Sequence, residues 1–374
     1  MNNIKIIHFA DIHFDTPFSD LPIKAAEERK EDLRETFGKI IDLSKEYKAD
    51  IVLMAGDLFD NSTVMKTTLD YIVKKFMEIP ETKVFISPGN HDPYNNKSFY
   101  SLVKWPENVY IFKGCREAVE LKELNTIVHG IGFSKSHERE SLLKDIKAQN
   151  DNYINIMVMH GDLSLSGAND YNPFTLKEIG ESGMEYIALG HRHSFSGILR
   201  EGKTHYAYSG NPEGRGFDET GEKGIIAGEI SKGRVNLKFV PLSKRKYYIR
   251  EIDITGCETY DDIVSRIKGE ISENMEHDLF KIILTGEIEE YFILNTELLH
   301  SKLENEFYFV KLIDNTSVKI DAETISEKFT LKGIYAKKLL EKLNNAEDEE
   351  EKLLYKEALK LGFHALSGGE IKIK

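Results

Sequence analysis

Five short polar motifs constrain the fold of this chain most strongly, because each begins where an apolar run of strand length ends. The motifs are Asp11-Ile12-His13, Gly56-Asp57-Leu58-Phe59-Asp60, Gly89-Asn90-His91-Asp92, His160-Gly161-Asp162 and Gly190-His191-Arg192-His193. The preceding runs cover residues 4–10, 51–55, 83–87, 154–159 and 186–189, and their composition is typical of buried strands. In open α/β sheets, ligand sites form beyond the carboxyl ends of the strands. We therefore expect the five motifs to converge at one edge of one sheet.

The side chains in these motifs are typical of a metal centre. Seven are candidate ligands: Asp11, His13, Asp57, Asn90, His160, His191 and His193. Nitrogen and oxygen donors without a thiolate suit divalent Mn, Fe or Zn. Seven donors are too many for one tetrahedral site with an open position, so they indicate two ions that share a carboxylate. Without cations, the carboxylates of Asp11 and Asp57 would lie together at an energetic cost.

Each motif taken alone has a simpler interpretation. Asp-x-His is usually a pair of surface residues, GNHD is typical of a tight turn, and GHRH could be two structural histidines. The metal centre is favoured because the five motifs occur together, each at an expected strand end. The histidines outside the motifs are expected to be structural. They are His8, His129, His137, His205, His277, His300 and His364.

The chain is longer than one ordinary domain, and its character changes along its 374 residues. Residues 1–245 alternate apolar runs with amphipathic helices, such as the one expected over 24–47, and become more purely β after 204. Residues 246–320 show the pattern strand, helix, strand, helix, strand, which predicts a small α+β domain. Residues 321–374 are helical in composition and form a tail with apolar faces near 334–343 and 353–361.

Charge does not exclude a phosphate-containing substrate, although the net charge is −13. Residues 201–250 carry 10 basic and 6 acidic side chains, whereas residues 251–300 carry 3 and 13. The acid is therefore concentrated in one later segment. Two cysteines cannot form a disulfide framework, and no apolar run reaches the ~20 residues that span a bilayer. We expect a cytoplasmic protein with no membrane segment.

The motif order DIH, GDLFD, GNHD, HGD, GHRH resembles the calcineurin-like metallophosphoesterase superfamily. The stretches IIHFADIHFD and YSGNPEGRGFDETGEKG resemble its SbcD-type DNA-repair nuclease branch, and most of all the YhaO-type bacterial members. The resemblance implies an α/β fold in which a two-sheet β-sandwich is flanked by helices in α-β-β-α layers. It also implies a small α+β capping domain and a C-terminal helical tail.

The resemblance implies a role for each motif residue. Asp11, His13 and His193 would hold the first metal ion, Asn90, His160 and His191 the second, and Asp57 would bridge them. His91 would act as general acid or transition-state stabiliser, with Asp92 orienting its imidazole. Some relatives carry a histidine where this chain has Asp60, so Asp60 is expected to support the loop.

The function implied by the resemblance is two-metal phosphodiester hydrolysis, in which activated water attacks phosphorus in line. Manganese is the metal expected first, with iron and zinc as alternatives. The substrate would be DNA, cleaved as an exonuclease or endonuclease. The partners would be an SbcC-like ABC ATPase with a coiled coil, bound by the C-terminal helices, and a second copy of the chain. The alternatives are a small-molecule phosphomonoesterase or cyclic-nucleotide phosphodiesterase, and a scaffold without catalysis.

Two glycine-rich segments resemble phosphate loops but lack the required context. Residues 216–223 would match a Walker A loop except for Glu222, and we expect a hairpin there from which Arg215 or Lys223 touches substrate phosphates. Residues 366–370 (LSGGE) resemble an ABC ATPase signature, but no Walker A motif accompanies them, and they are interpreted as a frayed tail.

Overall fold

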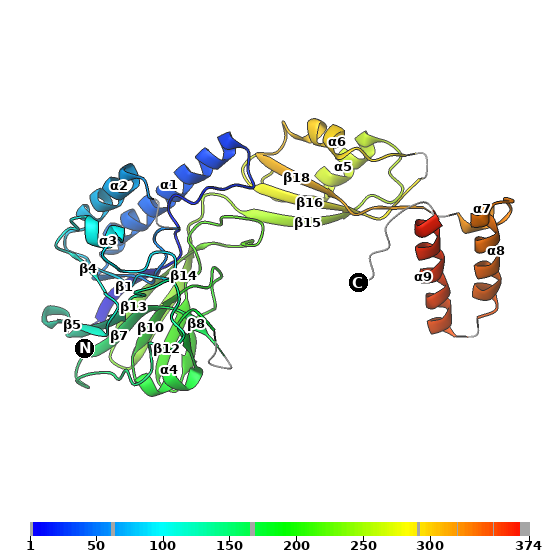
Figure 1. Ribbon diagram of the computed structural model, residues 1–374. Coiled ribbons are helices and arrows are strands. Elements are labelled where there is room, and N and C mark those ends of the chain that lie inside the picture. Colours follow the sequence, from blue (N-terminus) through cyan, green and yellow to red (C-terminus); the bar gives the residue numbers. More distant parts are fainter. Residues whose placement is uncertain are drawn as a thin grey trace. The chain divides into compact units, whose positions relative to one another are not determined.

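The computed structural model describes residues 3–60, 64–164, 169–289, 292–319, 321–346 and 348–366 (Figure 1). The chain divides into two compact units. The first contains residues 1–249 and 277–279, and the second contains residues 250–276 and 280–374. The finer division of the chain at residues 245 and 320 stays a prediction. No helix in the described ranges combines the length and the apolar character needed to cross a bilayer.

The first unit contains a six-stranded sheet in the order β14-β13-β1-β2-β3-β4. Its strands are β1 (Asn3–Phe9), β2 (Ile51–Met54), β3 (Lys83–Ile86), β4 (Val109–Ile111), β13 (Gly224–Ser231) and β14 (Arg234–Pro241). Strands β1 to β4 run parallel, with Phe9 opposite Met54, whereas β13 and β14 join antiparallel. Three of the five motifs follow the parallel strands β1, β2 and β3.

A second six-stranded sheet has the order β11-β12-β10-β7-β6-β5. Its strands are β5 (Glu117–Leu121), β6 (Thr126–Ile131), β7 (Ile154–His160), β10 (Tyr186–Gly190), β11 (Leu199–Glu201) and β12 (Thr204–Tyr208). The other two motifs follow β7 and β10, which pair in parallel with Gly190 opposite His160. The expectation that all five motifs share one sheet is therefore wrong. They lie at the carboxyl ends of strands from two sheets, because the apolar runs fix each strand but not its partner.

Alternating side chains on each strand fill three apolar layers. Ile4 and Ile6 of β1 pack with Ile156 and Val158 of β7 in the layer between the sheets. The other face of the first sheet packs against α1 (Ile23–Tyr47), α2 (Lys66–Met77) and α3 (Phe99–Leu102). The outer face of the second sheet packs against α4 (Leu176–Ser182). The expected α/β architecture, a two-sheet sandwich flanked by helices, is confirmed.

Helix α1 shows how the sequence sets these layers. Leu33, Phe37, Ile40 and Ile41 recur at the three- and four-residue spacing of one helix face, and all are buried. The Phe37 ring meets the Phe9 ring of β1 edge to face, with 6.3 Å between the ring centres. The helix pattern expected over 24–47 is confirmed to within one residue.

The remaining elements of the first unit are the short strands β8 (Asp162–Leu163) and β9 (Pro173–Phe174) and the 3₁₀ turn η1 (Lys122–Leu124). The elements that follow lie wholly or mostly in the second unit. The sheet β15-β16-β18 consists of β15 (Tyr247–Asp253), β16 (Leu279–Thr285) and β18 (Phe309–Asp314), and is accompanied by α5 (Tyr260–Glu270), α6 (Thr296–Leu303), β17 (Glu287–Ile288) and β19 (Ser317–Val318).

The C-terminal helices are α7 (Ala322–Ser326), α8 (Leu331–Asn344) and α9 (Glu349–Leu366). Helices α8 and α9 pack through Ala336, Leu359 and Phe363, and the Tyr335 hydroxyl donates to the Ala358 carbonyl at 2.6 Å. Ile334, Leu353 and Leu354 are exposed. The LSGGE segment lies outside the described residues from position 367 onward.

Candidate metal centre

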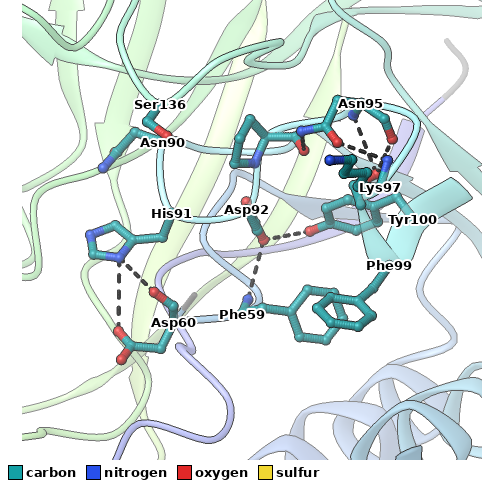
Figure 2. Close-up of a pocket in the computed structure, with 12 residues that line it drawn as sticks. Phe59, Asp60, Asn90, His91, Asp92, Asn95, Lys97, Phe99, Tyr100 and Ser136 are labelled. Atoms are coloured by element: carbon teal, nitrogen blue, oxygen red, sulfur yellow. Dashed lines mark hydrogen bonds and ion pairs between the residues drawn. The ribbon is translucent and has the colours of Figure 1, made fainter. Parts of the chain in front are cut away.

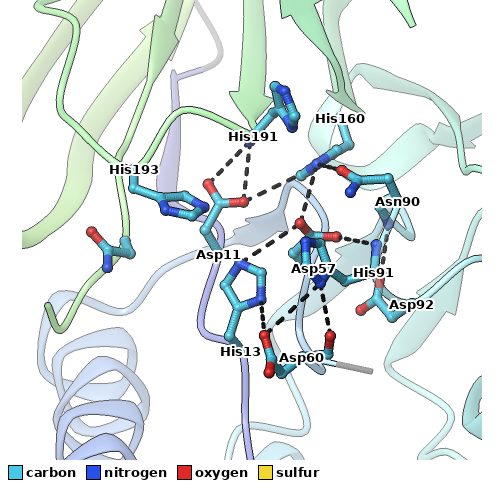
Figure 3. Close-up of polar contacts among 12 residues, drawn as sticks. Asp11, His13, Asp57, Asp60, Asn90, His91, Asp92, His160, His191 and His193 are labelled. Atoms are coloured by element: carbon cyan, nitrogen blue, oxygen red, sulfur yellow. Dashed lines mark hydrogen bonds and ion pairs between the residues drawn. The ribbon is translucent and has the colours of Figure 1, made fainter. Parts of the chain in front are cut away.

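The strand ends bring the seven expected ligands and His91 into one cluster (Figure 3). The backbone turns sharply there. Asp11, His13, Asp57 and His191 have φ values of 55°, 52°, 52° and 111°. Such left-handed conformations cost about 1–3 kcal/mol each for residues with a side chain, and they concentrate at functional sites. Strain at four candidate ligands indicates that the surrounding fold holds their side chains in place.

Two glycines allow the strand ends to approach each other. A Cβ atom on Gly89 would overlap the Asp57 carboxylate, and one on Gly190 would overlap the carbonyl oxygen of Ala55. Gly190 thus lets the end of β10, in the second sheet, pass directly against the end of β2, in the first. The close contact between the two sheets depends on these positions having no side chain.

Two of the histidines direct Nδ1 toward a hydrogen-bond acceptor and leave Nε2 for another partner, whereas His13 Nδ1 faces a carboxylate without making a hydrogen bond. His160 Nδ1 lies 2.9 Å from the Ala55 carbonyl oxygen, and His193 Nδ1 lies 2.7 Å from Glu219 Oε1. His13 Nδ1 lies 3.1 Å from Asp60 Oδ1. An acceptor at the outer ring nitrogen is the usual way in which proteins orient a metal-binding histidine.

The inward atoms meet around Asp57. His160 Nε2 lies 2.9 Å from Asn90 Oδ1 and 3.4 Å from Asp57 Oδ2. Potential ligand atoms of Asp11, Asp57 and His160 all lie within 4.8 Å of one another. The same limit holds for Asp11, His13 and His193. Asp57 Oδ2 is also 3.7 Å from His13 Nε2, so this carboxylate lies between the two groups.

His191 is brought to the same place but belongs to none of the three groups of potential ligands, the third of which is His13, Asp60 and His91. Its backbone N–H donates to both carboxylate oxygens of Asp11, at 3.1 Å each. Its ring packs edge to face on the His160 ring, with 5.2 Å between the ring centres, and is covered by Tyr171 at 5.1 Å.

The residues present fit a pair of divalent cations. Both ring nitrogens of His13 are buried and make no hydrogen bond, which is costly unless another partner binds there. Burial, together with the nearby Asp57 carboxylate, raises the pKa of Asp11 to about 7, and burial also raises the pKa of Asp57. Burial lowers the pKa of His160 and of His191 to about 4, so both imidazoles are neutral and can donate a lone pair.

Asp92 does not have the role expected for it. Its Oδ2 accepts from the Leu58 N–H at 2.7 Å and the Tyr100 hydroxyl at 2.6 Å, and its Oδ1 accepts from the Gly89 N–H at 2.7 Å. The ring of His91 is instead held by the Asp60 carbonyl oxygen, 2.7 Å from Nδ1. The prediction that Asp92 orients the imidazole is corrected. The carboxylate ties two motif loops together, because the turn after His91 sends the adjacent side chains in different directions.

The sequence did not indicate any role for Glu219, and it suggested only a substrate contact for Arg215, which in the structure bonds to two carboxylates. Arg215 donates to Glu219 Oε1 at 2.9 Å and to Asp60 Oδ1 at 3.3 Å. Burial alone would raise the pKa of Glu219, but His193 and Arg215 hold it well below its usual range. Burial alone would lower the pKa of His193, yet its bond to Glu219 raises it above the ordinary value.

These two residues lie on a connection between the sheets. The loop 209–223 leaves β12 in the second sheet and enters β13 in the first, so the hairpin expected at 216–223 is not formed. Lys223 donates to the His193 carbonyl oxygen at 2.6 Å. The only signal in the sequence was the GRGFDETGEK stretch, which resembles a phosphate loop and does not reveal a contact with His193.

Among the histidines expected to be structural, His8 is buried and its Nδ1 lies 2.8 Å from the Tyr186 hydroxyl. His129 Nε2 lies 2.9 Å from Asn155 Oδ1. The side chain of His364 lies outside the described residues.

Comparisons with known proteins agree with this geometry. A family model described as calcineurin-like phosphoesterase matches residues 4–195. The chain is 29% identical over 285 residues to "Uncharacterized metallophosphoesterase YhaO" of Bacillus subtilis, which covers 73% of this chain and 69% of that protein. It is 24% identical over 326 residues to "DNA double-strand break repair protein Mre11" of Saccharolobus solfataricus, covering 79% of each.

A protein with the same Mre11 description from Archaeoglobus fulgidus is 24% identical over 419 residues, covering 99% of this chain and 86% of that one. These relatives confirm the family resemblance that the motifs carry. Because the family model spans more than half of the sequence, the chain belongs to the calcineurin-like phosphoesterase family.

Proposed function

We propose that this protein is a two-metal phosphodiesterase that hydrolyses DNA, a nuclease subunit of the SbcD type. The observation that carries the proposal is the meeting of buried nitrogen and oxygen ligand atoms around Asp57, with both ring nitrogens of His13 lacking a hydrogen bond. Such a set of nitrogen and oxygen donors favours two divalent ions, with manganese first and iron or zinc as alternatives.

The ligands are divided between the two ions. Asp11, His13 and His193 would hold the first, and Asn90, His160 and His191 the second, with Asp57 shared. When bound, two such ions activate water and stabilise charge on a phosphate group during hydrolysis. The outer acceptors described above keep the imidazoles turned inward, with Ala55 acting on His160 and Glu219 on His193.

His91 is the residue proposed to donate a proton to the leaving oxygen. Its side chain is 44% exposed, and its backbone N–H donates to Asp57 Oδ1 at 3.0 Å. Hydrolysis breaks the bond between phosphorus and the leaving oxygen and adds the oxygen of water to phosphorus. The leaving oxygen needs a proton, and the imidazolium form of His91, whose Nδ1–H donates to the Asp60 carbonyl, can supply it from Nε2 and become the neutral imidazole.

DNA is favoured as substrate by the relatives. The Mre11 proteins are described as DNA double-strand break repair proteins. Their similarity to this chain extends beyond residue 195, where the match to the phosphoesterase family model ends. We propose a second copy of the chain and an SbcC-like ABC ATPase as partners, the latter bound through α8 and α9. The exposed leucines of these helices support this contact.

The test compares substrates on one enzyme preparation. The purified chain with Mn²⁺ is given single-stranded DNA, blunt duplex DNA, p-nitrophenyl phosphate and a cyclic nucleotide. We expect cleavage of DNA that is abolished by chelation and restored by Mn²⁺. Strong turnover of the small esters without DNA cleavage would reverse the proposal in favour of a small-molecule phosphomonoesterase or cyclic-nucleotide phosphodiesterase.

A further inference from the structure

A cavity of about 490 Å³ lies beside His91 and is not used by the metal ligands, apart from Asn90 on its wall (Figure 2). Figure 2 shows His91 and Asp60 at one side of this cavity and Phe99 and Lys97 at the other. Its size falls within the ~300–1,000 Å³ range of sites for small organic ligands. A group bound there would therefore lie next to the imidazole proposed to protonate the leaving oxygen.

The lining is partly apolar and partly hydrogen-bonding. Phe99 is half-buried, with its ring edge to face on the buried Phe59 ring at 5.8 Å, and Pro93 adds a second apolar surface. Asn95 and Ser136 are exposed and contribute neutral polar groups. This mixture suits a nucleoside, which has a flat apolar face and polar edges, better than a purely apolar or a purely ionic ligand.

Charge in the cavity favours an anion. Of its two carboxylates, Asp92 is buried and fully hydrogen-bonded, and Asp60 is paired with Arg215. Lys97 is exposed, and within the ranges that the structure describes no carboxylate lies within 4.0 Å of its ammonium group. The ammonium is thus available to a phosphate that follows or precedes the bound nucleoside.

We propose that this cavity binds one nucleotide unit of the substrate on the leaving-group side of the scissile bond, with Phe99 contacting the base and Lys97 the adjacent phosphate. The proposal rests on the proposed function and refines it. The metal ions would select a phosphate ester of any kind, whereas the cavity would select an ester whose leaving group is a nucleoside.

The experiment uses two inhibitors of the hydrolysis of bis(p-nitrophenyl) phosphate by the full chain with Mn²⁺. Inorganic phosphate probes the metal centre alone. Thymidine 3′,5′-bisphosphate probes the centre together with the cavity, because one of its phosphates can lie at the metal centre and the other beside Lys97. In Phe99→Leu and Lys97→Gln we expect the inhibition constant for the nucleotide, divided by that for phosphate, to rise about tenfold. Lys122→Gln is the matched control, because Lys122 is an exposed lysine on η1 outside the cavity. Its ratio should equal the wild-type value.

An unchanged ratio in both cavity variants would overturn the proposal, and so would a parallel rise of both inhibition constants, which would mean that the variants disturb the metal centre. Lys97 is exposed, so its variant tests the idea even if Phe99→Leu fails to fold. The same enzyme is also given thymidylyl-(3′→5′)-thymidine and DNA. Failure of the wild type to cleave either one refutes the nuclease function, whereas the inhibitor ratio still decides whether the cavity binds a nucleotide.

Discussion

Replacing Glu219 by glutamine tests how the metal centre is built, because this carboxylate supports only one of the two proposed ion sites. Its Oε1 accepts from His193 and from the Arg215 guanidinium, at 2.7 and 2.9 Å, and its Oε2 accepts from the Asn211 amide at 2.6 Å and the Arg215 N–H at 2.8 Å. Every partner donates. A glutamine keeps the shape but turns one acceptor into an NH₂ group, so one donor must face another donor.

The expected loss follows from the position of Glu219 behind His193. Removing the acceptor behind a ligating histidine typically weakens metal binding or activity 10–100-fold, which is about 1.4–2.7 kcal/mol. The second ion should bind within about threefold of the wild-type affinity. His160 keeps the Ala55 carbonyl as its acceptor, and a backbone carbonyl is untouched by the substitution.

The assay is a titration of the metal-free protein with Mn²⁺ in the presence of a competing chelator, fitted with two dissociation constants. Glu123→Gln is a suitable control because Glu123 is an exposed acidic residue on η1. Equal weakening of both sites would show that Glu219 supports the fold as a whole. Two unchanged constants would show that it does not orient His193.

Three further substitutions are expected to change three different properties: the turnover number, the free energy of unfolding and the melting temperature. His91→Ala should keep both ions and lose on the order of 10²–10⁴ in kcat, and unchanged turnover with DNA would exclude His91 as the acid. Asp92→Asn should lower the free energy of unfolding by about 1–3 kcal/mol in a denaturant titration, because the amide cannot accept from the N–H groups of both motif loops. Asp11→Asn should raise the Tm of the metal-free protein near neutral pH and reduce the rise in Tm on adding Mn²⁺, because the first ion loses a ligand while the ligands of the second remain. The pKa of Asp11 is raised by folding from 3.8 to about 7, so its contribution to stability is present below 3.8 and is lost as the pH rises through 7. Calorimetry of both proteins between about pH 5 and 8 checks this, and a lower metal-free Tm for the variant throughout would contradict it.

Much of the first unit could be predicted from the sequence because the relevant signals are local. The helix expected over 24–47 is found at Ile23–Tyr47, and the strand runs are found within a residue or two of their expected ends. A buried strand or an amphipathic helix can be recognised from the hydrophobic pattern within a stretch of 5 to about 18 residues. The polar motifs follow from the same reasoning, since the residue after a buried strand is where the chain meets solvent or a ligand.

The partners of these elements could not be predicted, because pairing depends on residues that are distant in the chain. β13 lies beside β1 although more than 200 residues separate them, and β7 and β10 form a second sheet instead of extending the first. The same limit applies within the site. Asp92 is adjacent to His91 in sequence but bonds elsewhere, and Glu219 reaches His193 from a loop without any periodic pattern.

The division of the ligands between two sheets has a consequence for stability. Asp11 and His13 follow β1 in the first sheet, whereas His193 follows β10 in the second, so the first ion would bind both sheets together. The second ion would do the same through Asn90, after β3, and His160, at the end of β7. A ligand that binds only the folded arrangement stabilises it by mass action, by about 2.7 kcal/mol at a hundredfold excess over its dissociation constant. Metal binding at these residues would therefore stabilise the fold as well as support the chemistry, because it would offset the repulsion and the backbone strain that arise where the two sheets bring these side chains together.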